Sequence, residues 1–309
     1  MNFFLSLFNS LPGAVTQGLL WGIMGIGVYV TYRILDVADL TVDGTLATGG
    51  ALCVMLMRLG CNPWIALLCA FLAGMLAGLV TGLFHTRCGI PAILAGILTQ
   101  LALYSVNLRI MGGKANLPIS VDKYDLLVSQ RYVRELSLRN PLPLAILFLV
   151  VMIAALYWFF GTEYGSALRA TGANPHMARA QGINTGAKVT VGLMLSNGLV
   201  AASGALLAQY QGAADVNMGR GAIVIGLAAV IVGEVLFGKV FRNFALKLTA
   251  VALGAVVYYL VIQVVLQLGL NTNDLKLLTA LVVALFLAIP YWKSLAKPKK
   301  QRLGGDGHA

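Results

Sequence analysis

Charged residues are scarce in this sequence. Asp, Glu, Lys and Arg together make up 11% of the 309 residues, whereas hydrophobic residues make up 59%. The mean hydropathy is +0.85. A soluble domain carries about 25% charged residues because its surface must be hydrated. The composition therefore excludes a soluble domain and predicts an all-α polytopic membrane protein, since helices satisfy their own backbone hydrogen bonds in lipid.

Acidic residues are scarcer than basic ones: 11 Asp and Glu stand against 22 Lys and Arg, for a net charge of +11. The basic residues lie mostly in loops and in the C-terminal tail, where they orient membrane helices. We therefore expect contact with membrane lipid and no nucleic-acid partner.

The sequence also lacks the usual signatures of metal, redox and nucleotide chemistry. Its four cysteines form no CxxC pair, and no His lies at ligand spacing from them. A phosphate-binding loop needs G-x-x-x-x-G-K-[ST]. The nearest match, "MGGKAN" at 111–116, has Leu108 in place of the first Gly and Ala115 in place of Ser or Thr. We expect a chain that is not an enzyme and holds no cofactor, with any ATP bound by a partner subunit.

Long apolar runs dominate what is present. A helix needs about 20 apolar residues to cross the bilayer, and eight stretches qualify: 14–33, 63–84, 90–111, 142–161, 188–210, 219–238, 244–269 and 275–292. Residues 1–13 read as an N-terminal interfacial segment and 293–309 as a basic tail. The membrane domain is thus expected to cover 14–292, with eight or nine transmembrane helices.

The ninth candidate, 35–58, has a polar first half and an apolar second half. Its glycines let the backbone break, so we expect a broken or re-entrant segment, as in transporters where such segments line a cavity. Ionisable groups at membrane depth are functional candidates. The candidate pathway residues are Asp36, Asp39, Thr41, Asp43, Thr45 and Thr48. The alternative is a structural break whose acids lie in interfacial water.

Basic loops predict the orientation, because short loops rich in Lys and Arg stay cytoplasmic. The tail, the loop 238–243 and the loop 162–187 all carry such residues, which predicts a cytoplasmic C-terminus. The hydrophilic stretch 112–141 then lies outside. The N-terminus lies outside if 35–58 crosses fully and inside if it re-enters; the re-entrant or broken form is slightly favoured.

The stretch "RATGANPHMARAQGIN" at 169–184 interrupts the apolar pattern. Asn174 can cap a helix, Pro175 is tolerated at its first position and Gly182 can end it, which predicts a short helix over 175–181. Ala173, Ala178 and Ala180 leave a flat surface, with polar groups on His176, Arg179 and Gln181. Such a helix suits docking into a groove on a partner, and the alternative is a solvated connector.

The spacing Gly-x-Asn-Pro-x-x-Ala-x-x-x-Gly-Ile resembles the coupling loop of ABC importer permeases, in particular the branched-chain amino acid family. The "SGALL" run at 203–207 and "GLAAVIVGEVLFG" at 226–238 also resemble that family, whereas "DLTVDGT" at 39–45 resembles ribose-type sugar permeases as well. The resemblance covers most of 14–292. It assigns ATPase coupling to Gly172, Ala173, Asn174, Pro175, Ala178, Arg179 and Gly182.

That resemblance implies a permease subunit in a bacterial plasma membrane that imports a small solute, an amino acid before a sugar. The implied partners are an ABC ATPase, an external solute-binding protein and a second permease chain, which favours a homodimer. An ion-coupled secondary transporter is the alternative, because the Asp cluster could bind a cation.

Four further polar residues lie in apolar stretches. Glu234, near the predicted inner end of its helix, is expected to pair with Lys239 or Lys188, or else to act at a cytoplasmic gate. Asn197, Gln209 and Gln263 are expected to form hydrogen bonds between helices rather than to bind substrate.

Overall fold

The computed structural model describes residues 2–133, 140–267 and isolated positions between 277 and 288, with only the backbone given for 2–9. The elements run in this order: α1 (Asn2–Tyr29), the π-helical η1 (Val30–Ile34), α2 (Val42–Arg58), α3 (Pro63–Thr86), α4 (Ala92–Ile110), β1 (Asn116–Pro118), η2 (Gln130–Tyr132), α5 (Pro141–Gly161), α6 (Glu163–Ala173), α7 (Pro175–Ala180), α8 (Thr185–Gln211), β2 (Ala213–Asp215), α9 (Ala222–Phe237) and α10 (Phe244–Gln267).

The helices confirm the predicted class. Among the described residues, six helices are long and apolar enough to cross a membrane: α1 continued by η1, α3, α4, α5, α8 and α10. Helices α2 and α9 are shorter, at 17 and 16 residues. The predicted span 275–292 and the tail 293–309 lie largely or wholly outside the described residues. A total of eight or nine spans therefore stays a prediction.

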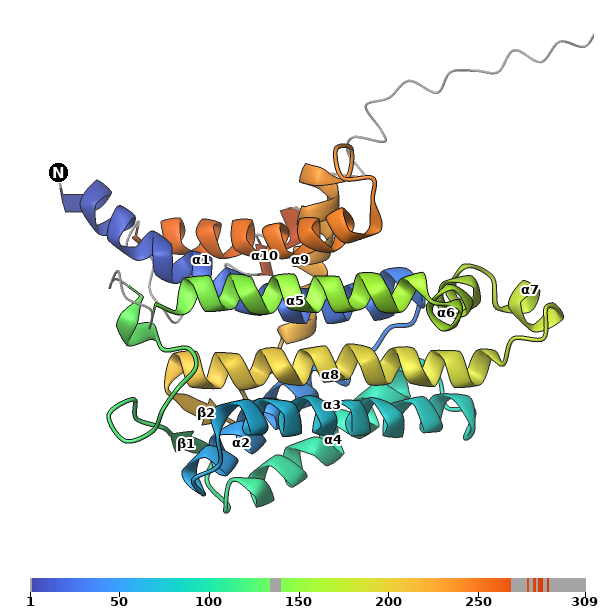
Figure 1. Ribbon diagram of the computed structural model, residues 1–309, viewed down its shortest axis with the longest axis horizontal. Coiled ribbons are helices and arrows are strands. Elements are labelled where there is room, and N and C mark those ends of the chain that lie inside the picture. Colours follow the sequence, from blue (N-terminus) through green and yellow to red (C-terminus); the bar gives the residue numbers. More distant parts are fainter. Residues whose placement is uncertain are drawn as a thin grey trace, which may run out of the picture.

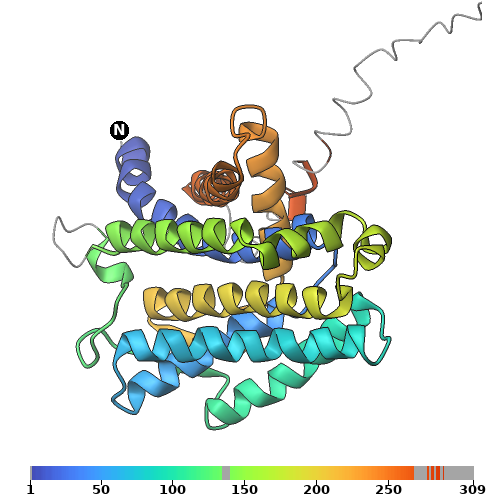
Figure 2. The same ribbon diagram turned by 45° about the vertical axis from the view of Figure 1, so that its right-hand side comes forward.

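Helix α8 is the centre of the bundle. It lies between α5 on one side and α3 on the other (Figures 1 and 2). The windows that identify α8 and α1 as spans are 83% buried within the chain, against 22% for α4 and α5. Outer helices instead expose large apolar side chains, such as Leu101 on α4 and Trp158 on α5. Because such residues are stable in lipid, α4 and α5 are suited to face the bilayer.

A glycine stripe allows α3 to pack closely on α8. Gly74, Gly78 and Gly82 are four residues apart and so share one face of α3. A Cβ atom at any of the three would overlap α8, as at Gly82, where it would lie 2.7 Å from Cγ2 of Thr190. Small residues are how membrane helices reach such contact, since lipid provides no hydrophobic drive between them.

The segment 35–58 is broken, as predicted, and it runs from one end of the bundle to the other. It leaves η1, which packs on Gly172 of α6, and helix begins again only at Val42. Helix α2 then runs parallel to α8, because Thr45 bonds to Asn197 while Gly49 lies against Ala201. It thus ends far from α6 and α7, and whether the segment crosses or re-enters the membrane stays a prediction.

Helix α1 is antiparallel to α8, with Ser203 bonded to Leu20 and Tyr210 bonded to Gly13. The N-terminal part of α1 therefore lies at the end of the bundle opposite α7. The helix begins at Asn2, so residues 2–13 form its first turns. Their interfacial position stays a prediction.

The stretch 112–133 closes the end of the bundle opposite α7. Strand β1 pairs antiparallel with β2, with Asn116 opposite Asp215. The side-chain oxygen of Gln209 on α8 accepts the N–H of Leu127 at 2.9 Å. The two predicted loops, one external and one cytoplasmic, thus lie at opposite ends of the same central helix (Figure 1).

Candidate coupling surface and buried polar network

The short helix predicted at 175–181 is present as α7, Pro175–Ala180. The side-chain oxygen of Asn174 accepts the N–H groups of His176 and Met177 at 3.1 and 3.0 Å, which caps the helix start. Gly182 follows with φ of +78°, a left-handed conformation that ends helices and favours glycine. Caps at both ends hold this short helix in a defined position.

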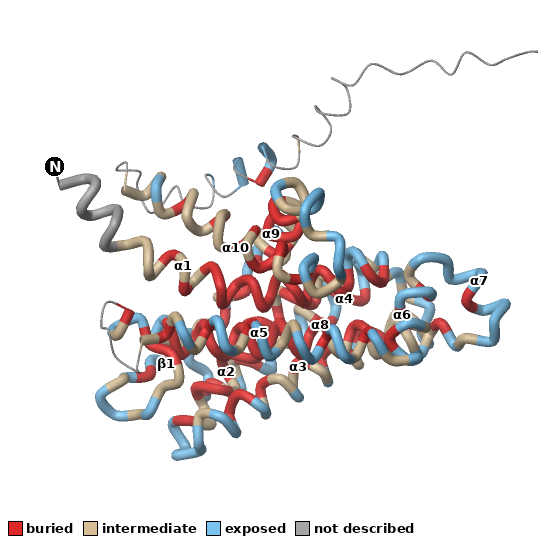
Figure 3. The backbone as a smooth tube through the Cα atoms, turned by 45° about the horizontal axis from the view of Figure 1, so that its top comes forward, coloured by how far each residue is buried: buried red, intermediate tan, exposed pale blue. Residues whose placement is uncertain are grey.

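The exposed face of α7 differs from the one expected. Ala178 is only 3% exposed, so its methyl group packs within its own chain and offers no docking contact. Met177 is 63% exposed, and His176 and Arg179 are exposed as well. Figure 3 shows α7 as an exposed projection with a single buried position. The sequence analysis did not single out Met177, because it considered the small residues and not the positions that share the exposed face of the helix.

Gly172 packs on the end of η1. A Cβ atom there would overlap the carbonyl oxygen of Ile34, and the side chain of Leu35 fills the space beside Gly192 on α8. Gly172 was expected to contact a partner, but the structure places it half-buried between α6 and η1. A movement of α6 therefore meets the backbone that leads directly into the polar segment 36–41.

That polar segment enters a buried hydrogen-bond network in the middle of the bundle. The Asp39 carboxylate accepts the N–H of Thr41 at 2.9 Å and the Asn197 amide at 2.6 Å. The Thr45 hydroxyl donates to the other side-chain atom of Asn197 at 2.7 Å. All four residues are at most 3% exposed. The sharing of one Asn between Asp39 and Thr45 ties the broken segment to α8.

A chain of hydroxyls extends the network to α3 and α4. The Thr41 hydroxyl lies 2.8 Å from that of Thr81, which in turn donates to Thr99 at 2.9 Å. Four helices, α2, α3, α4 and α8, therefore meet through this set of buried side chains. Because unpaired polar groups are costly in a membrane interior, each partner in the network constrains the others.

Asp43 bonds to the start of α9, unlike Asp39, Thr41 and Thr45, which belong to the buried network. Its two carboxylate oxygens accept the N–H groups of Gly221 and Ile223, both at 2.9 Å. Gly221 directly precedes α9 and has no side chain to cap it, and Ile223 lies in the first turn of the helix. A carboxylate at a helix N-terminus also interacts favourably with the helix dipole. Asp43 thus anchors the start of α9 to α2.

The six predicted pathway residues do not share one surface in the single chain. Asp39, Thr41, Thr45 and Thr48 are buried, Asp43 caps α9, and Asp36 is exposed. Asp36 also has φ of +55°, which is uncommon for a residue other than glycine. Their role in a pathway stays a prediction.

Glu234 binds neither of the lysines expected for it. Both of its oxygens accept from the guanidinium of Arg33, at 2.7 Å each, so the pair is bidentate. Lys188 instead lies 3.0 Å from the ring centroid of Tyr164. The Arg33–Glu234 pair joins η1 to α9 and is partly exposed, with side chains 52% and 34% accessible.

A basic cavity of about 540 Å³ adjoins this pair and the end of α6. Arg33, Arg169, Arg242 and Lys247 contribute to its lining, together with the backbone of Gly172. Arg169 also donates to the carbonyl of Phe160 at 2.9 Å. The α7 end of the bundle therefore carries concentrated positive charge.

The three expected helix-bridging residues behave differently. Asn197 bridges α2 and α8 as described, and Gln209 joins α8 to Leu127 and donates to the Cys53 sulfur at 3.3 Å. Gln263 forms no such bond within the described part of the chain. The expectation is confirmed for the first two residues only.

The chain thus combines helices long and apolar enough to span a membrane with an exposed, capped helix at one end of the bundle. The family model for the permease component of branched-chain amino acid transport systems matches residues 10–293. The chain belongs to this family. It is a permease subunit of an ABC importer and not an enzyme. It is a multi-pass protein of the bacterial inner membrane, and its family implies an ATPase and a substrate-binding protein as partners.

Other bacterial proteins resemble this chain along most of its length. The tyrosine transport system permease protein of Clostridioides difficile is 41% identical over 280 residues, 91% of each chain. An uncharacterized protein of Rickettsia prowazekii is 35% identical over 285 residues, 91% of this chain and 97% of that one. The ribose import permease protein of Escherichia coli is 26% identical over 232 residues, 75% of this chain and 70% of that one.

Proposed function

We propose that this chain carries an aromatic amino acid such as tyrosine into the cell. The observation that carries the proposal is the 41% identity to a tyrosine transport permease over 91% of both chains. A sugar is less well supported, because the ribose permease is 26% identical over a smaller part of each chain.

The ATPase docks on α7. The capped ends of this helix hold Met177, His176 and Arg179 in fixed, exposed positions at one tip of the bundle. An exposed apolar side chain at the centre of a small contact is what a partner groove can bury. Asn174, Pro175 and Gly182 set the helix ends, while Ala173 lets a partner approach closely. Ala178 and Gly172 hold α7 and α6 on the rest of the chain.

The α7 end of the bundle is cytoplasmic, and so is the C-terminus. The four cations of the basic cavity support this orientation, because basic residues concentrate on the cytoplasmic side. The opposite end, with the β1–β2 pair and the stretch 112–133, then receives the external binding protein. Two copies of the chain face two ATPase subunits as a homodimer.

The coupling movement passes from α6 through Gly172 to η1. From there it reaches the segment 36–41, whose Asp39 is bonded to Asn197 at the centre of α8. The Arg33–Glu234 pair, between η1 and α9, acts as a cytoplasmic gate. In this mechanism Asp36 lies where the moving segment meets the pathway, and the buried threonines position that segment.

Transport by the assembled complex tests the proposal. The permease, its ATPase and its binding protein are reconstituted in liposomes, and uptake of labelled L-tyrosine is measured with ATP and with a non-hydrolysable analogue. ATP-dependent uptake is expected. Accumulation by the permease alone, driven by an ion gradient without ATP, would instead favour the secondary transporter.

A further inference from the structure

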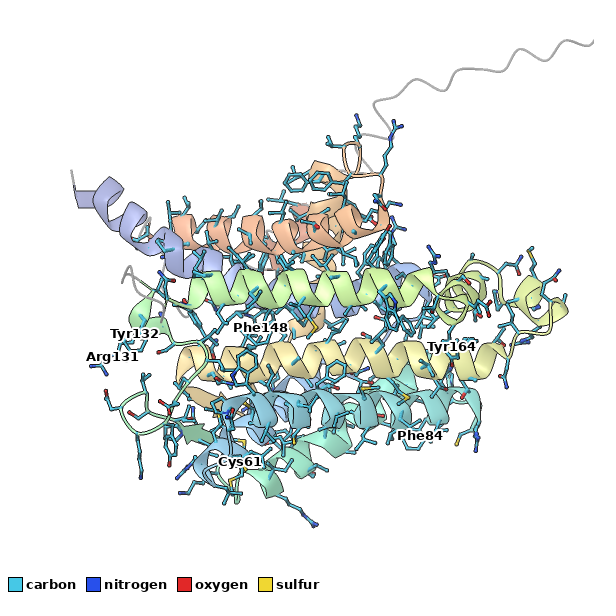
Figure 4. The ribbon with its side chains drawn as sticks, viewed as in Figure 1. Cys61, Phe84, Arg131, Tyr132, Phe148 and Tyr164 are labelled. Atoms are coloured by element: carbon cyan, nitrogen blue, oxygen red, sulfur yellow. The ribbon has the colours of Figure 1, made fainter. Side chains whose placement is uncertain are left out.

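A second polar site lies at the end of the bundle opposite α7. It is a cavity of about 370 Å³ between α1, α8, α10 and η2, and its lining includes Gln17, Gln130, Arg131, Tyr210 and Gln263. Figure 4 labels Arg131 and Tyr132 at this end of the molecule, away from Tyr164 and Phe84. The volume lies within the range of about 300–1,000 Å³ that is usual for small-molecule sites.

The glutamine side chains that line this cavity make no hydrogen bonds to the described part of the chain. Within the described residues, no hydrogen bond is made by the amides of Gln17, Gln130 or Gln263. Gln17 and Gln263 lie on helices α1 and α10, both of which are long and apolar enough to span a membrane. A free amide on such a helix costs free energy unless it faces water or a ligand. Packing therefore does not explain these two glutamines.

The chemistry of the lining suits a solute with a carboxylate. Each glutamine amide offers both donors and an acceptor, and Arg131 adds a positive charge. Arg131 is bound to Asp122 through one nitrogen at 2.6 Å, and the guanidinium has five N–H donors in total. No carboxylate lines the cavity among its described residues. Tyr210 already donates to the carbonyl of Gly13, so its hydroxyl is left as an acceptor.

We propose that this cavity is an outer binding site for an amino acid on its way to the translocation pathway. Arg131 binds the carboxylate, and the amide oxygens of Gln17 and Gln263 accept hydrogen bonds from the ammonium group. This inference rests on the proposed function, since it takes the same solute and the same external side.

Substrate protection of a single cysteine tests the site. Gln130→Cys, at an exposed residue that lines the cavity but is not one of the proposed ligands, is introduced into a chain whose four native cysteines are replaced and whose L-tyrosine uptake is retained. The rate of modification by a membrane-impermeant maleimide is measured on the complex with its ATPase. L-Tyrosine is expected to slow modification about fivefold or more, whereas tyramine, which lacks the carboxylate, leaves the rate unchanged.

Two variants complete the design. Gln211→Cys is the matched control, because Gln211 is an exposed glutamine at the outer end of α8 and does not line the cavity. Its modification rate should not respond to L-tyrosine. Adding Arg131→Gln to Gln130→Cys should remove the protection.

The possible failures are distinct. Absence of ATP-dependent L-tyrosine uptake by the unmodified complex overturns the proposed function. Normal uptake together with an unprotected Gln130→Cys, or with equal protection by tyramine, overturns the outer site alone. Failure of the external reagent to reach position 130 overturns the outer location of the site.

Discussion

Replacing Met177 with alanine removes the exposed large apolar side chain of α7. Full burial of a methionine side chain stabilises by about 1.5–3 kcal/mol, and 63% of this residue is exposed in the subunit. Burial of that fraction against the ATPase would therefore contribute about 1–2 kcal/mol. Met177→Ala should weaken ATPase binding about 5- to 30-fold.

The assay is a titration of labelled ATPase onto the permease in lipid nanodiscs, followed by uptake in proteoliposomes. Thermal unfolding of the isolated permease should change little, because exposed substitutions usually alter stability by no more than about 0.5 kcal/mol. Leu59→Ala is the matched control. Leu59 is also exposed, at 69%, but it follows α2 at the opposite end of the bundle.

A comparison with Ala178→Trp separates docking from folding. Ala178 is buried, so a tryptophan there overpacks the loop, a type of change that costs about 1–3 kcal/mol. Loss of transport in that variant should come with reduced thermal stability. Wild-type ATPase affinity in Met177→Ala would refute the docking role of α7, since Met177 is the exposed large apolar side chain of that helix.

Three further predictions follow from the packing of the bundle. Asn197→Leu should destabilise the permease by about 1–3 kcal/mol in thermal unfolding, because it removes the hydrogen bonds that Asn197 makes with the buried side chains of Asp39 and Thr45. An unchanged melting temperature would contradict the network. Gly78→Leu should give no folded permease after purification, because the new side chain would overlap the backbone of α8. Gly161→Ala should fold normally, because the space around Gly161 is open. Arg33→Gln and Glu234→Gln should change the uptake rate to a similar extent, and the double variant should have no larger effect on uptake than either single variant. The free energy of unfolding should change by at most about 1 kcal/mol, because the pair is partly exposed. Unaltered uptake in all three variants would exclude the gate.

Local signals in the sequence determined the class of protein and several of its elements. Apolar runs of about 20 residues predict membrane helices because the bilayer thickness sets their length. The structure describes helices at seven of the eight predicted places, although α1 begins at Asn2 rather than at residue 14. The start of α7 was equally readable, since a cap is made by a residue two or three positions away, as Asn174 is from His176 and Met177.

Tertiary packing decided the partners of the polar side chains. Glu234 pairs with Arg33, which is 201 residues away, rather than with the nearer lysines, and Asp39 finds Asn197 across 158 residues. Composition and spacing do not encode which helix faces which, so such pairs follow only from the packed arrangement. The same holds for Ala178 and Met177: adjacent residues on a helix point about 100° apart, and the position of α6 and α8 determines which one is buried.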